Sequence, residues 1–378
     1  MKSNKIKILH IIDHYKVGGP GKTIINSYKY INKKRYDIHV CTFVESPNKE
    51  TEFTIEIDKL SIPRLFLADF KGVNLRQIKM LKKYIEKSKI DILHSHGYKT
   101  DFIGIILKYL LGTHVKIVTT QHGWITNNLK QTLYMKLDQF ALRLFDGSIF
   151  VSKDMVDKYR IKNNRLRNMR IIHNAIVIGD YQKLERKESM RREIGIKKED
   201  KVIGVVGRLS YEKGCNDLID AFIQIKKMIK NVCIVFVGDG PLLDTLKKKV
   251  KRNNCENEVY FVGHQKTVQP YYEAFDMLAS LSSTEGLSNV ILEALVNRLP
   301  IIATDVGGNR EIIDHEYSGL LVKYGQKEQY VKEIKRIICD EELGNYLGTN
   351  GFKTILKRFA FNRRMINVEN IYEKIMSY

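Results

Sequence analysis

The feature that most constrains the fold of this chain is a repeated alternation of short apolar runs, rich in β-branched residues, with amphipathic segments of helix length. Strands are expected at residues 6–12, 38–43, 91–94, 116–120 and 148–151, and again at 201–206, 232–237, 259–261, 277–281, 300–303 and 320–322. Helices are expected between them, for example at 74–88, 100–111 and 130–145. Continuous apolar strands that alternate with helices are typical of parallel sheets covered by helices on both faces.

A charge-rich stretch with few apolar residues, 181–201, separates two such alternating halves. Each half begins with a strand and a glycine-containing turn, and 378 residues suffice for two domains of about 150 residues. We therefore expect an α/β fold of two doubly wound, Rossmann-like domains facing a cleft, with the boundary near residue 178. Ligands of such sheets bind at the carboxyl ends of the strands, so functional residues are expected in the loops there.

The composition excludes several classes of protein. A hydrophobic share of 43% argues against disorder, and the longest apolar run, residues 102–111, is far shorter than the roughly 20 residues of a membrane-spanning helix. The chain enters its first strand without the small-residue cleavage site of a signal peptide. The five cysteines are scattered and form no C-x-x-C pair, which favours a reducing cytosol over disulfides or a structural zinc site.

The net charge is strongly positive, because 64 Lys and Arg residues outnumber 43 Asp and Glu residues to give +21. Nucleic acid, an anionic membrane surface and phosphorylated substrates all suit such a charge, and so does a composition bias toward Lys, Ile and Asn along the whole chain. Two local basic clusters are residues 160–170 and 246–252. We expect each cluster to be either a solvated face or a contact with anionic lipid.

The first predicted strand leads into a glycine-rich loop, HYKVGGPGKT, at residues 14–23. It nearly matches the phosphate-binding pattern G-x-x-x-x-G-K-[ST], but Lys16 occupies the position of the first glycine. What remains is a Gly18-Gly19 turn before a helix, where backbone N–H groups can approach an anion. The alternatives are a plain strand-to-helix turn and a P-loop-like nucleotide phosphotransferase that uses Lys22.

Basic and glycine-containing loops follow the strands of the second half. VVGRLSYEKG at residues 205–214 places Arg208 and Lys213 on one loop, where a fork and a point charge suit a diphosphate. GDGP at 238–241 lacks the third glycine of a dinucleotide fingerprint, so NAD is poorly supported, and Pro241 suits the first turn of a helix. FVGH at 261–264 places His264 after a strand, where it either meets a flat base or is structural.

The segment 281–313 combines acidic residues with a helix start. Ser288 can cap a helix over 289–297, whose N-terminal N–H groups and dipole favour an anion. Glu285 precedes this helix and Glu293 lies on it, eight residues later. Two carboxylates also suit a glycosidase, although both come from one loop-helix unit, and ordinary solvated positions are a third interpretation. A second glycine turn, DVGGNRE, follows the next strand.

Histidines end two strands of the first half, in HSHG at 94–97 and TTQHG at 119–123. His94, His96 and His122 are metal ligands by type, but the chain has no H-E-x-x-H and no Asp-x-Asp. We therefore expect no metal site. His122 is expected to contact a sugar at the mouth of the sheet, and His94 to be mostly packed.

Taken in order, these motifs resemble glycosyltransferase family 4, the retaining nucleotide-sugar transferases with the two-domain GT-B fold. The resemblance also uses VSK at residues 151–153 and IHNAI at 172–176, and it covers nearly the whole chain. It implies an acceptor-side domain over 1–178 plus a returning C-terminal helix at 362–378, and a donor-binding domain over 179–361. Pro20, Gly21 and Lys22 depart from the pattern of many relatives in a loop that helps to bind the acceptor, so the acceptor stays open.

The resemblance implies a role for each matching position. Arg208 and Lys213 would hold the donor diphosphate, and Glu293 would accept hydrogen bonds from the ribose. Glu285 would touch the donor sugar near its reacting carbon, and His122 would contact that sugar from the first domain. Further contacts with the donor are expected from Gly18, Gly19, Gly263, His264, Gly286, Leu287, Ser288 and Asn289.

The expected function is transfer of a hexose-type sugar, with retention, from a UDP- or GDP-sugar to a glycan or lipid-linked acceptor of bacterial surface polysaccharide or glycolipid. The nucleotide-sugar is a substrate, and no further cofactor, metal or nucleic acid is expected. A cytoplasmic protein is expected, with attachment to the inner face of the plasma membrane through its basic surface. The alternatives are the P-loop-like phosphotransferase and a non-enzymatic protein that binds anionic surfaces.

Overall fold

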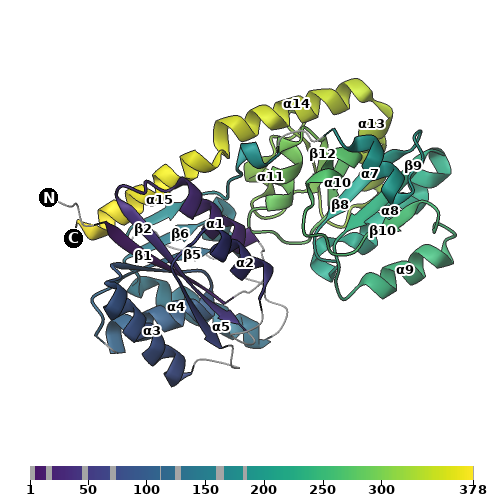
Figure 1. Cartoon of the computed structure of the whole chain (residues 1–378). Helices are drawn as coiled ribbons and strands as arrows, with labels where there is room; N and C mark the ends of the chain where they lie inside the picture. Colours follow the sequence, from purple (N-terminus) through teal and green to yellow (C-terminus); the bar gives the residue numbers. More distant parts are fainter. Residues whose placement is uncertain are drawn as a thin grey trace. The chain divides into compact units, whose positions relative to one another are not determined.

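The computed structural model describes residues 5–13, 19–44, 50–68, 74–110, 112–123, 129–158, 166–181 and 185–377. The chain divides into two compact units (Figure 1). Unit 1 comprises Met1–Asn174 and Phe361–Tyr378, and unit 2 comprises Ala175–Ala360. Each unit is an α/β layer structure around one parallel sheet, as the alternation of apolar runs and amphipathic segments predicts.

Unit 1 is built on a 7-stranded parallel sheet in the order β3-β2-β1-β4-β5-β6-β7. Its strands are β1 (Ile6–Ile12), β2 (Tyr36–Val44), β3 (Arg64–Ala68), β4 (Ile92–Ser95), β5 (Lys116–Gln121), β6 (Gly147–Phe150) and β7 (Met169–Ile171). Its helices are α1 (Gly19–Tyr30), α2 (Glu52–Lys59), α3 (Leu75–Ser88), α4 (Tyr98–Ile105), α5 (Leu129–Ala141), α6 (Lys153–Lys158) and α15 (Phe361–Met376), with short turns η1 (Ile106–Leu110) and η2 (Leu142–Leu144).

Unit 2 is built on a 6-stranded parallel sheet in the order β10-β9-β8-β11-β12-β13. Its strands are β8 (Lys201–Val206), β9 (Val232–Val237), β10 (Val259–Phe261), β11 (Met277–Ser280), β12 (Ile301–Thr304) and β13 (Leu320–Val322). Its helices are η4 (Ile178–Tyr181), α7 (Lys187–Ile194), η5 (Tyr211–Lys213), α8 (Cys215–Met228), α9 (Leu243–Arg252), α10 (Gln269–Ala274), α11 (Asn289–Val296), α12 (Asn309–Ile312), α13 (Lys327–Cys339) and α14 (Glu341–Arg358).

The prediction of two Rossmann-like parallel sheets is confirmed. In each sheet the strand order reverses beside its first strand, so that β1 lies next to β4 and β8 lies next to β11. The crevice outside the carboxyl ends of two such strands is the usual ligand site of a doubly wound sheet. The fold therefore offers one candidate position in each unit.

Several details differ from the sequence prediction. The prediction lacks strands β3 and β7, because the β3 sequence RLFLA has no β-branched residue and the β7 sequence MRI is interrupted by an arginine. The helix expected at 100–111 starts earlier, as α4, and ends in a π-helical turn, η1. Pro241 lies in a turn and not in the first turn of α9, which begins at Leu243.

The C-terminal helix α15 packs in unit 1 beside α1 and the start of β2. The Asn32 backbone N–H donates to Glu369 Oε1 at 2.9 Å, and the Tyr36 hydroxyl donates to Glu373 at 3.3 Å. The last helix of the sequence thus covers the first strands. No helix in the part of the chain that the structure describes is both long and apolar enough to cross a membrane.

Candidate functional site

The position outside β8 and β11 in unit 2 is a pocket with an empty volume of about 320 Å³. It brings together four of the residues that the sequence singles out, Arg208, Lys213, Glu285 and Ser288. The other lining residues are Val205, Val206, Gly207, Cys215, Ala279, Ser280, Ser282 and Val290. Cations from the loop after β8 and a carboxylate from the loop after β11 therefore share one small cavity.

An ion pair crosses this pocket between Lys213 and Glu285. The Lys213 Nζ lies 2.6 Å from Glu285 Oε1, and the Ser282 hydroxyl donates to the same oxygen at 2.7 Å. The Glu285 side chain is 12% exposed and the Lys213 side chain 30%. An ammonium group has three N–H donors, so Lys213 can bind an anion while it keeps its bond to Glu285. Ser282 was not identified from the sequence, because a serine in a loop gives no distinctive signal.

Arg208 extends toward solvent at the rim of this pocket, with 61% of its side chain exposed. Its Nη2 donates to Glu212 Oε1 at 3.0 Å, and the Ser210 hydroxyl donates to the same oxygen at 2.7 Å. Partial burial opposes ionisation of Glu212, but the hydrogen bonds from Ser210 and the backbone, with the charges of Arg208 and Lys213, hold the Glu212 pKa below its usual value. The guanidinium keeps further donors for an anionic ligand.

Two glycines allow the loops around the pocket to approach one another. Gly214 has φ +67°, and a Cβ there would lie 2.0 Å from the Leu281 carbonyl oxygen. Gly307, in the DVGGNRE turn, has φ +54°, and its Cβ would lie 1.9 Å from the Glu285 carbonyl oxygen. Only glycine fits both the backbone conformation and the space. The loop that carries Glu285 is therefore packed between two glycine turns.

The helix that follows, α11, starts at the pocket. Ser288 is its N-cap residue, but the predicted side-chain cap is wrong, because the Ser288 side chain makes no capping hydrogen bond. Gly286 accepts a hydrogen bond from the Gly308 N–H at 2.9 Å, which joins this loop to the second glycine turn. Ser288 lines the pocket, whereas Gly286, Leu287 and Asn289 do not. The first turn of α11 is the part of the helix that meets the cavity.

Glu293 lies deeper, on α11, and is 7% exposed. The Tyr272 hydroxyl donates to its Oε2 at 2.7 Å, and the Tyr181 hydroxyl also bonds to this carboxylate. Burial, together with the Glu293 charge, raises the pKa of both tyrosines above the usual range. Two phenols thus fix the carboxylate that the sequence predicts as the ribose contact. Both tyrosines were missed, since neither belongs to a motif.

The remaining donor contacts predicted in unit 2 lie elsewhere. Gly263 follows β10 and accepts a hydrogen bond from the Gly238 N–H at 2.9 Å, while His264 beside it is exposed. Neither lines the pocket of Lys213 and Glu285. In unit 1, Gly19 is the first residue of α1, whereas Gly18 lies outside the described residues.

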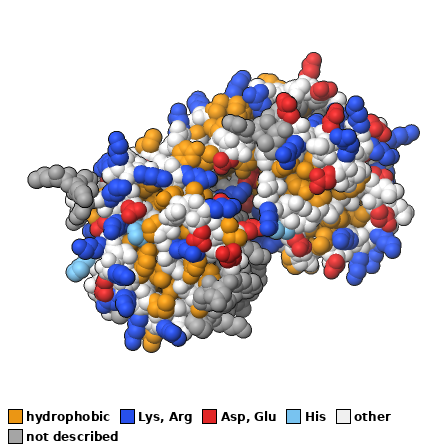
Figure 2. Space-filling model, viewed as in Figure 1, with side chains coloured by type: hydrophobic (Ala, Val, Ile, Leu, Met, Phe, Trp, Pro, Cys, Tyr) orange, Lys and Arg blue, Asp and Glu red, His pale blue; other side chains and the backbone are white. Residues whose placement is uncertain are grey.

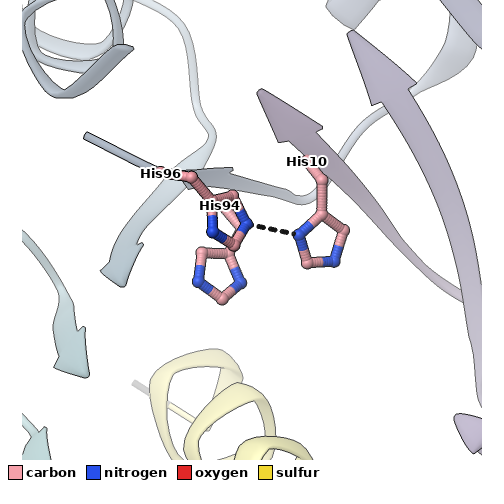
Figure 3. A group of neighbouring side chains, drawn as sticks. All are labelled: His10, His94 and His96. Atoms are coloured by element: carbon pink, nitrogen blue, oxygen red, sulfur yellow. Dashed lines mark hydrogen bonds between the residues drawn. The ribbon is translucent and has the colours of Figure 1, made fainter. Parts of the chain in front are cut away.

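Unit 1 carries a column of histidines on the corresponding strands, β1 and β4, and in the loops that follow β4 and β5. His10 on β1 pairs in register with His94 on β4, and His96 follows two residues later on the same face. Figure 3 shows the three imidazoles side by side. Nδ1 of His10 lies 2.9 Å from Nε2 of His96, and Nδ1 of His96 lies 3.1 Å from Nε2 of His122, which follows β5. His10 was missed in the sequence, where it reads as part of an apolar strand.

The three buried histidines His10, His94 and His96 have ligand atoms within 4.8 Å of one another and are metal ligands by type. Their rings stack, however, with interplanar angles of 29° for His10 and His94 and 14° for His94 and His96. Lone pairs in stacked rings run side by side and do not converge on one point. Both His94 nitrogens also meet hydroxyls, Nδ1 with Tyr372 at 2.6 Å and Nε2 with Thr120 at 2.8 Å. The geometry suits hydrogen bonding better than an ion.

Burial keeps this column neutral. Desolvation, with a smaller contribution from the Arg364 charge, lowers the pKa of His10 to about 3. Desolvation and the neighbouring imidazoles lower the pKa of His94 and His96 well below 6.5. His94 is therefore packed, as the sequence analysis expects. His122 is partly exposed at the end of the column.

Comparison with known proteins identifies the family. The model for "Glycosyltransferase Family 4" matches residues 17–179, and the model for "Glycosyl transferases group 1" matches residues 186–354. A glycosyltransferase of Methanocaldococcus jannaschii is 30% identical over 298 residues, which cover 71% of this chain and 72% of that protein. The Escherichia coli UDP-Gal:α-D-GlcNAc-diphosphoundecaprenol α-1,3-galactosyltransferase is 24% identical over 98% of each chain.

Solved structures show the same fold. Anabaena HepE, in its crystal structure with UDP and glucose, has a TM-score of 0.85 at 20% identity, over 97% of this chain and 99% of that one. This chain therefore belongs to the family 4 glycosyltransferases and has their GT-B fold of two Rossmann-like domains.

Proposed function

We propose that this glycosyltransferase moves a hexose-type sugar, with retention, from a UDP-sugar to a glycan or lipid-linked acceptor of a bacterial surface polysaccharide or glycolipid. The observation that carries the proposal is the pocket outside β8 and β11, where Lys213 is paired with Glu285 and Arg208 stands at the rim. UDP is favoured over GDP because the E. coli relative uses a UDP-sugar and the HepE structure holds UDP. The diphosphoundecaprenol acceptor of that relative supports a lipid-linked acceptor here.

Sugar transfer requires positive charge beside the leaving diphosphate. When the bond between the sugar C1 and the diphosphate oxygen breaks, negative charge develops on the leaving UDP. Lys213, Arg208 and the first turn of α11 would stabilise that charge, and their proximity in one pocket supports this role. The acceptor oxygen then bonds to C1 on the same face, and its proton passes to the leaving phosphate. We expect this transfer to proceed without a divalent ion.

The other donor contacts follow from residue type. Glu293, held by two phenols, keeps acceptor capacity for the ribose hydroxyls, because a carboxylate offers about four lone-pair sites. Glu285 would meet the donor sugar, and Gly263 and His264 would lie near the base. In unit 1, His122 would donate to the sugar.

The first experiment is a panel of UDP- and GDP-sugars, read out as thermal stabilisation and as slow hydrolysis of the donor. A UDP-sugar present at about 100 times its Kd should stabilise the folded chain by about 2.7 kcal/mol. Lys213→Ala should lose this stabilisation, while Lys22→Ala should keep it. Hydrolysis that persists in EDTA would support the metal-free expectation.

Stabilisation by GDP-sugars alone would overturn the choice of donor, and stabilisation by none would overturn the proposal. The phosphotransferase alternative makes the opposite prediction for the two lysines, because it requires Lys22. Membership of the glycosyltransferase family already disfavours that alternative.

We also propose that the enzyme attaches to anionic lipid through α5. Four apolar side chains of α5 and of the η2 turn after it are exposed at helical spacing: Leu133, Leu137, Phe140 and Leu144. Lys136 and Arg143 are exposed between them, and the acid of the helix, Asp138, is buried. Apolar residues interleaved with cations are typical of helices that lie in a membrane interface.

Neighbouring residues extend this α5 surface. The Tyr109 hydroxyl donates to the Leu144 carbonyl at 2.8 Å, and Leu110 beside it is 76% exposed. The Arg167 charge acts on Tyr109, so part of the predicted basic cluster at 160–170 lies close to the apolar stripe. Residues 159–165 of that cluster lie outside the described residues.

The basic cluster at 246–252 differs, because it forms the exposed face of α9 without an exposed large apolar side chain among the described residues. Lys and Arg side chains over the visible surface are interspersed with Asp and Glu side chains (Figure 2).

Vesicle sedimentation distinguishes lipid binding through α5 from lipid binding through α9. A Phe140→Ser/Arg143→Glu variant should lose binding to anionic vesicles, and Lys247→Glu/Lys251→Glu should retain it. The reverse pattern, or equal binding to neutral vesicles, would overturn the assignment to α5.

A further inference from the structure

We propose that His10 and Arg364, acting through His96, fix the ring hydrogen of His122 on Nδ1. His10 and His96 are then positioning residues, and His122 presents a constant N–H donor at the mouth of the unit 1 sheet. The inference rests on the proposed function only for the group that accepts this hydrogen bond, namely an oxygen of the transferred sugar.

The first step is the connectivity. His10, His96 and His122 form a chain of two hydrogen bonds, in which Nδ1 of each earlier ring faces Nε2 of the next at 2.9 Å and 3.1 Å. A neutral imidazole has one N–H donor and one acceptor nitrogen, so a choice at one ring dictates the choice at the next. The whole chain therefore has two states, which differ in the direction of both bonds.

The second step decides the direction at the buried end. His10 Nε2 is buried and has no hydrogen-bond partner among the described residues. If this nitrogen carried the hydrogen, a buried N–H donor would be left without an acceptor among the described residues. The charge of the buried Arg364, whose Nη1 donates to the carbonyls of Ile172 and His173, acts on the His10 ring and favours a bare nitrogen over an N–H on its unpartnered side.

The third step follows the chain outward. With Nε2 bare, His10 carries its hydrogen on Nδ1 and donates to His96 Nε2. His96 must then carry its hydrogen on Nδ1 and donate to Nε2 of His122. His122 is left with its hydrogen on Nδ1. The direction set at the buried His10 thus reaches the partly exposed ring of His122, two side chains away.

His94 provides an internal control, because it stacks on His10 and His96 without joining the chain. Its nitrogens bond to Tyr372 and Thr120. Removing the Tyr372 hydroxyl disturbs the same cluster and the same helix, α15, but leaves both bonds of the chain in place.

The test reads the tautomer of His122 by long-range ¹H–¹⁵N NMR of the full chain labelled at histidine, with His122→Gln to assign its signals. The free enzyme should show a protonated Nδ1 and a bare Nε2 on His122. His10→Leu and Arg364→Met should convert it to a mixture of tautomers, whereas His10→Asn, whose amide can donate from the Nδ1 position, and Tyr372→Phe should preserve it. Sugar transfer should fall about tenfold in His10→Leu, the effect of one misdirected hydrogen bond.

In the unmodified enzyme, hydrogen on Nε2 of His122, or on both of its nitrogens, would overturn the inference. This outcome does not depend on the folding of any variant. An unchanged tautomer in folded His10→Leu would also overturn it. The spectrum is recorded without the nucleotide-sugar, so the tautomer of His122 is measured independently of the proposed function. Failure of the inference and failure of the proposed function can therefore be told apart.

Discussion

The two units place opposite chemistry at equivalent positions of the same sheet topology. Outside β8 and β11, unit 2 holds a partly exposed ion pair, Lys213 with Glu285. On β1 and β4, unit 1 holds neutral imidazoles, of which His10 and His94 are 2% exposed. The difference shows that the fold supplies only the location, and that the side chains at the strand ends decide whether an anion or a neutral hydroxyl is suited to it.

Acidification should produce the largest difference in stability between the two units. Burial lowers the pKa of His10 to about 3, and the pKa values of His94 and His96 are also well below 6.5. The unfolded chain therefore binds protons below pH 6.5 that the folded chain does not, and the free energy of unfolding falls as the pH falls. Each of the three histidines should lower the free energy of unfolding by on the order of 1 kcal/mol per pH unit below 6.5.

Hydrogen exchange read by mass spectrometry distinguishes the units in this experiment. Peptides of unit 1 should lose protection on acidification before peptides of unit 2. Loss of protection first in unit 2 would contradict the contrast between a neutral and a charged site.

The next largest effect concerns Lys213. Lys213→Ala should lower turnover about 100-fold or more, because it removes a positioned charge from the leaving diphosphate. Steady-state kinetics with the donor found in the panel measure the loss, and Lys247→Ala, on the exposed face of α9, is the matched control. Near-normal turnover in Lys213→Ala would mean that the ion pair is structural.

A smaller effect is expected at Glu293. Tyr272→Phe removes one hydrogen bond from a buried carboxylate, and bonds of this kind contribute roughly 1.5–3 kcal/mol. Urea unfolding should show a loss in this range, and the Kd for UDP should rise. Tyr260→Phe, which removes an exposed hydroxyl in the same unit, is the control. Weaker UDP binding in the control alone would refute a ribose contact at Glu293.

The smallest effect should follow from Ser282→Ala. Its hydroxyl orients Glu285, and loss of one such bond corresponds to about a fivefold fall in turnover. KM for the donor should change less than kcat if Glu285 acts near the reacting carbon. Ser189→Ala on α7 serves as the control, and a change confined to KM would assign Glu285 to ground-state binding.

Much of the fold could be predicted because strands buried in parallel sheets have continuous apolar sequences. β8, β9, β10 and β13 have the predicted bounds, although β10 and β13 lie at the edges of their sheet. The edge strands β3 and β7 are not in the prediction, because RLFLA has no β-branched residue and MRI is interrupted by an arginine. The π-helical end of α4 gave no signal either, since its hydrogen bonding depends on packing.

The candidate site was only partly predictable. Arg208, Lys213 and Glu285 lie in recognisable strand-end motifs, and the structure gathers them in one pocket. His10 and Tyr372 lie in an apolar strand and an amphipathic helix, and only the register of β1 with β4 and the docking of α15 bring them to His94. Such contacts join residues far apart in the sequence, so no local sequence pattern predicts them.

The return of α15 to unit 1 has a consequence for synthesis. Strands β1 to β7 leave the ribosome before unit 2, but Arg364 and Tyr372 of α15, which act on the histidines of those strands, leave it after unit 2. Unit 2 is continuous in sequence and can complete its core while the other sheet still lacks a helix. The half of the enzyme that is made first is therefore finished last, and until then its imidazoles are open to solvent protons.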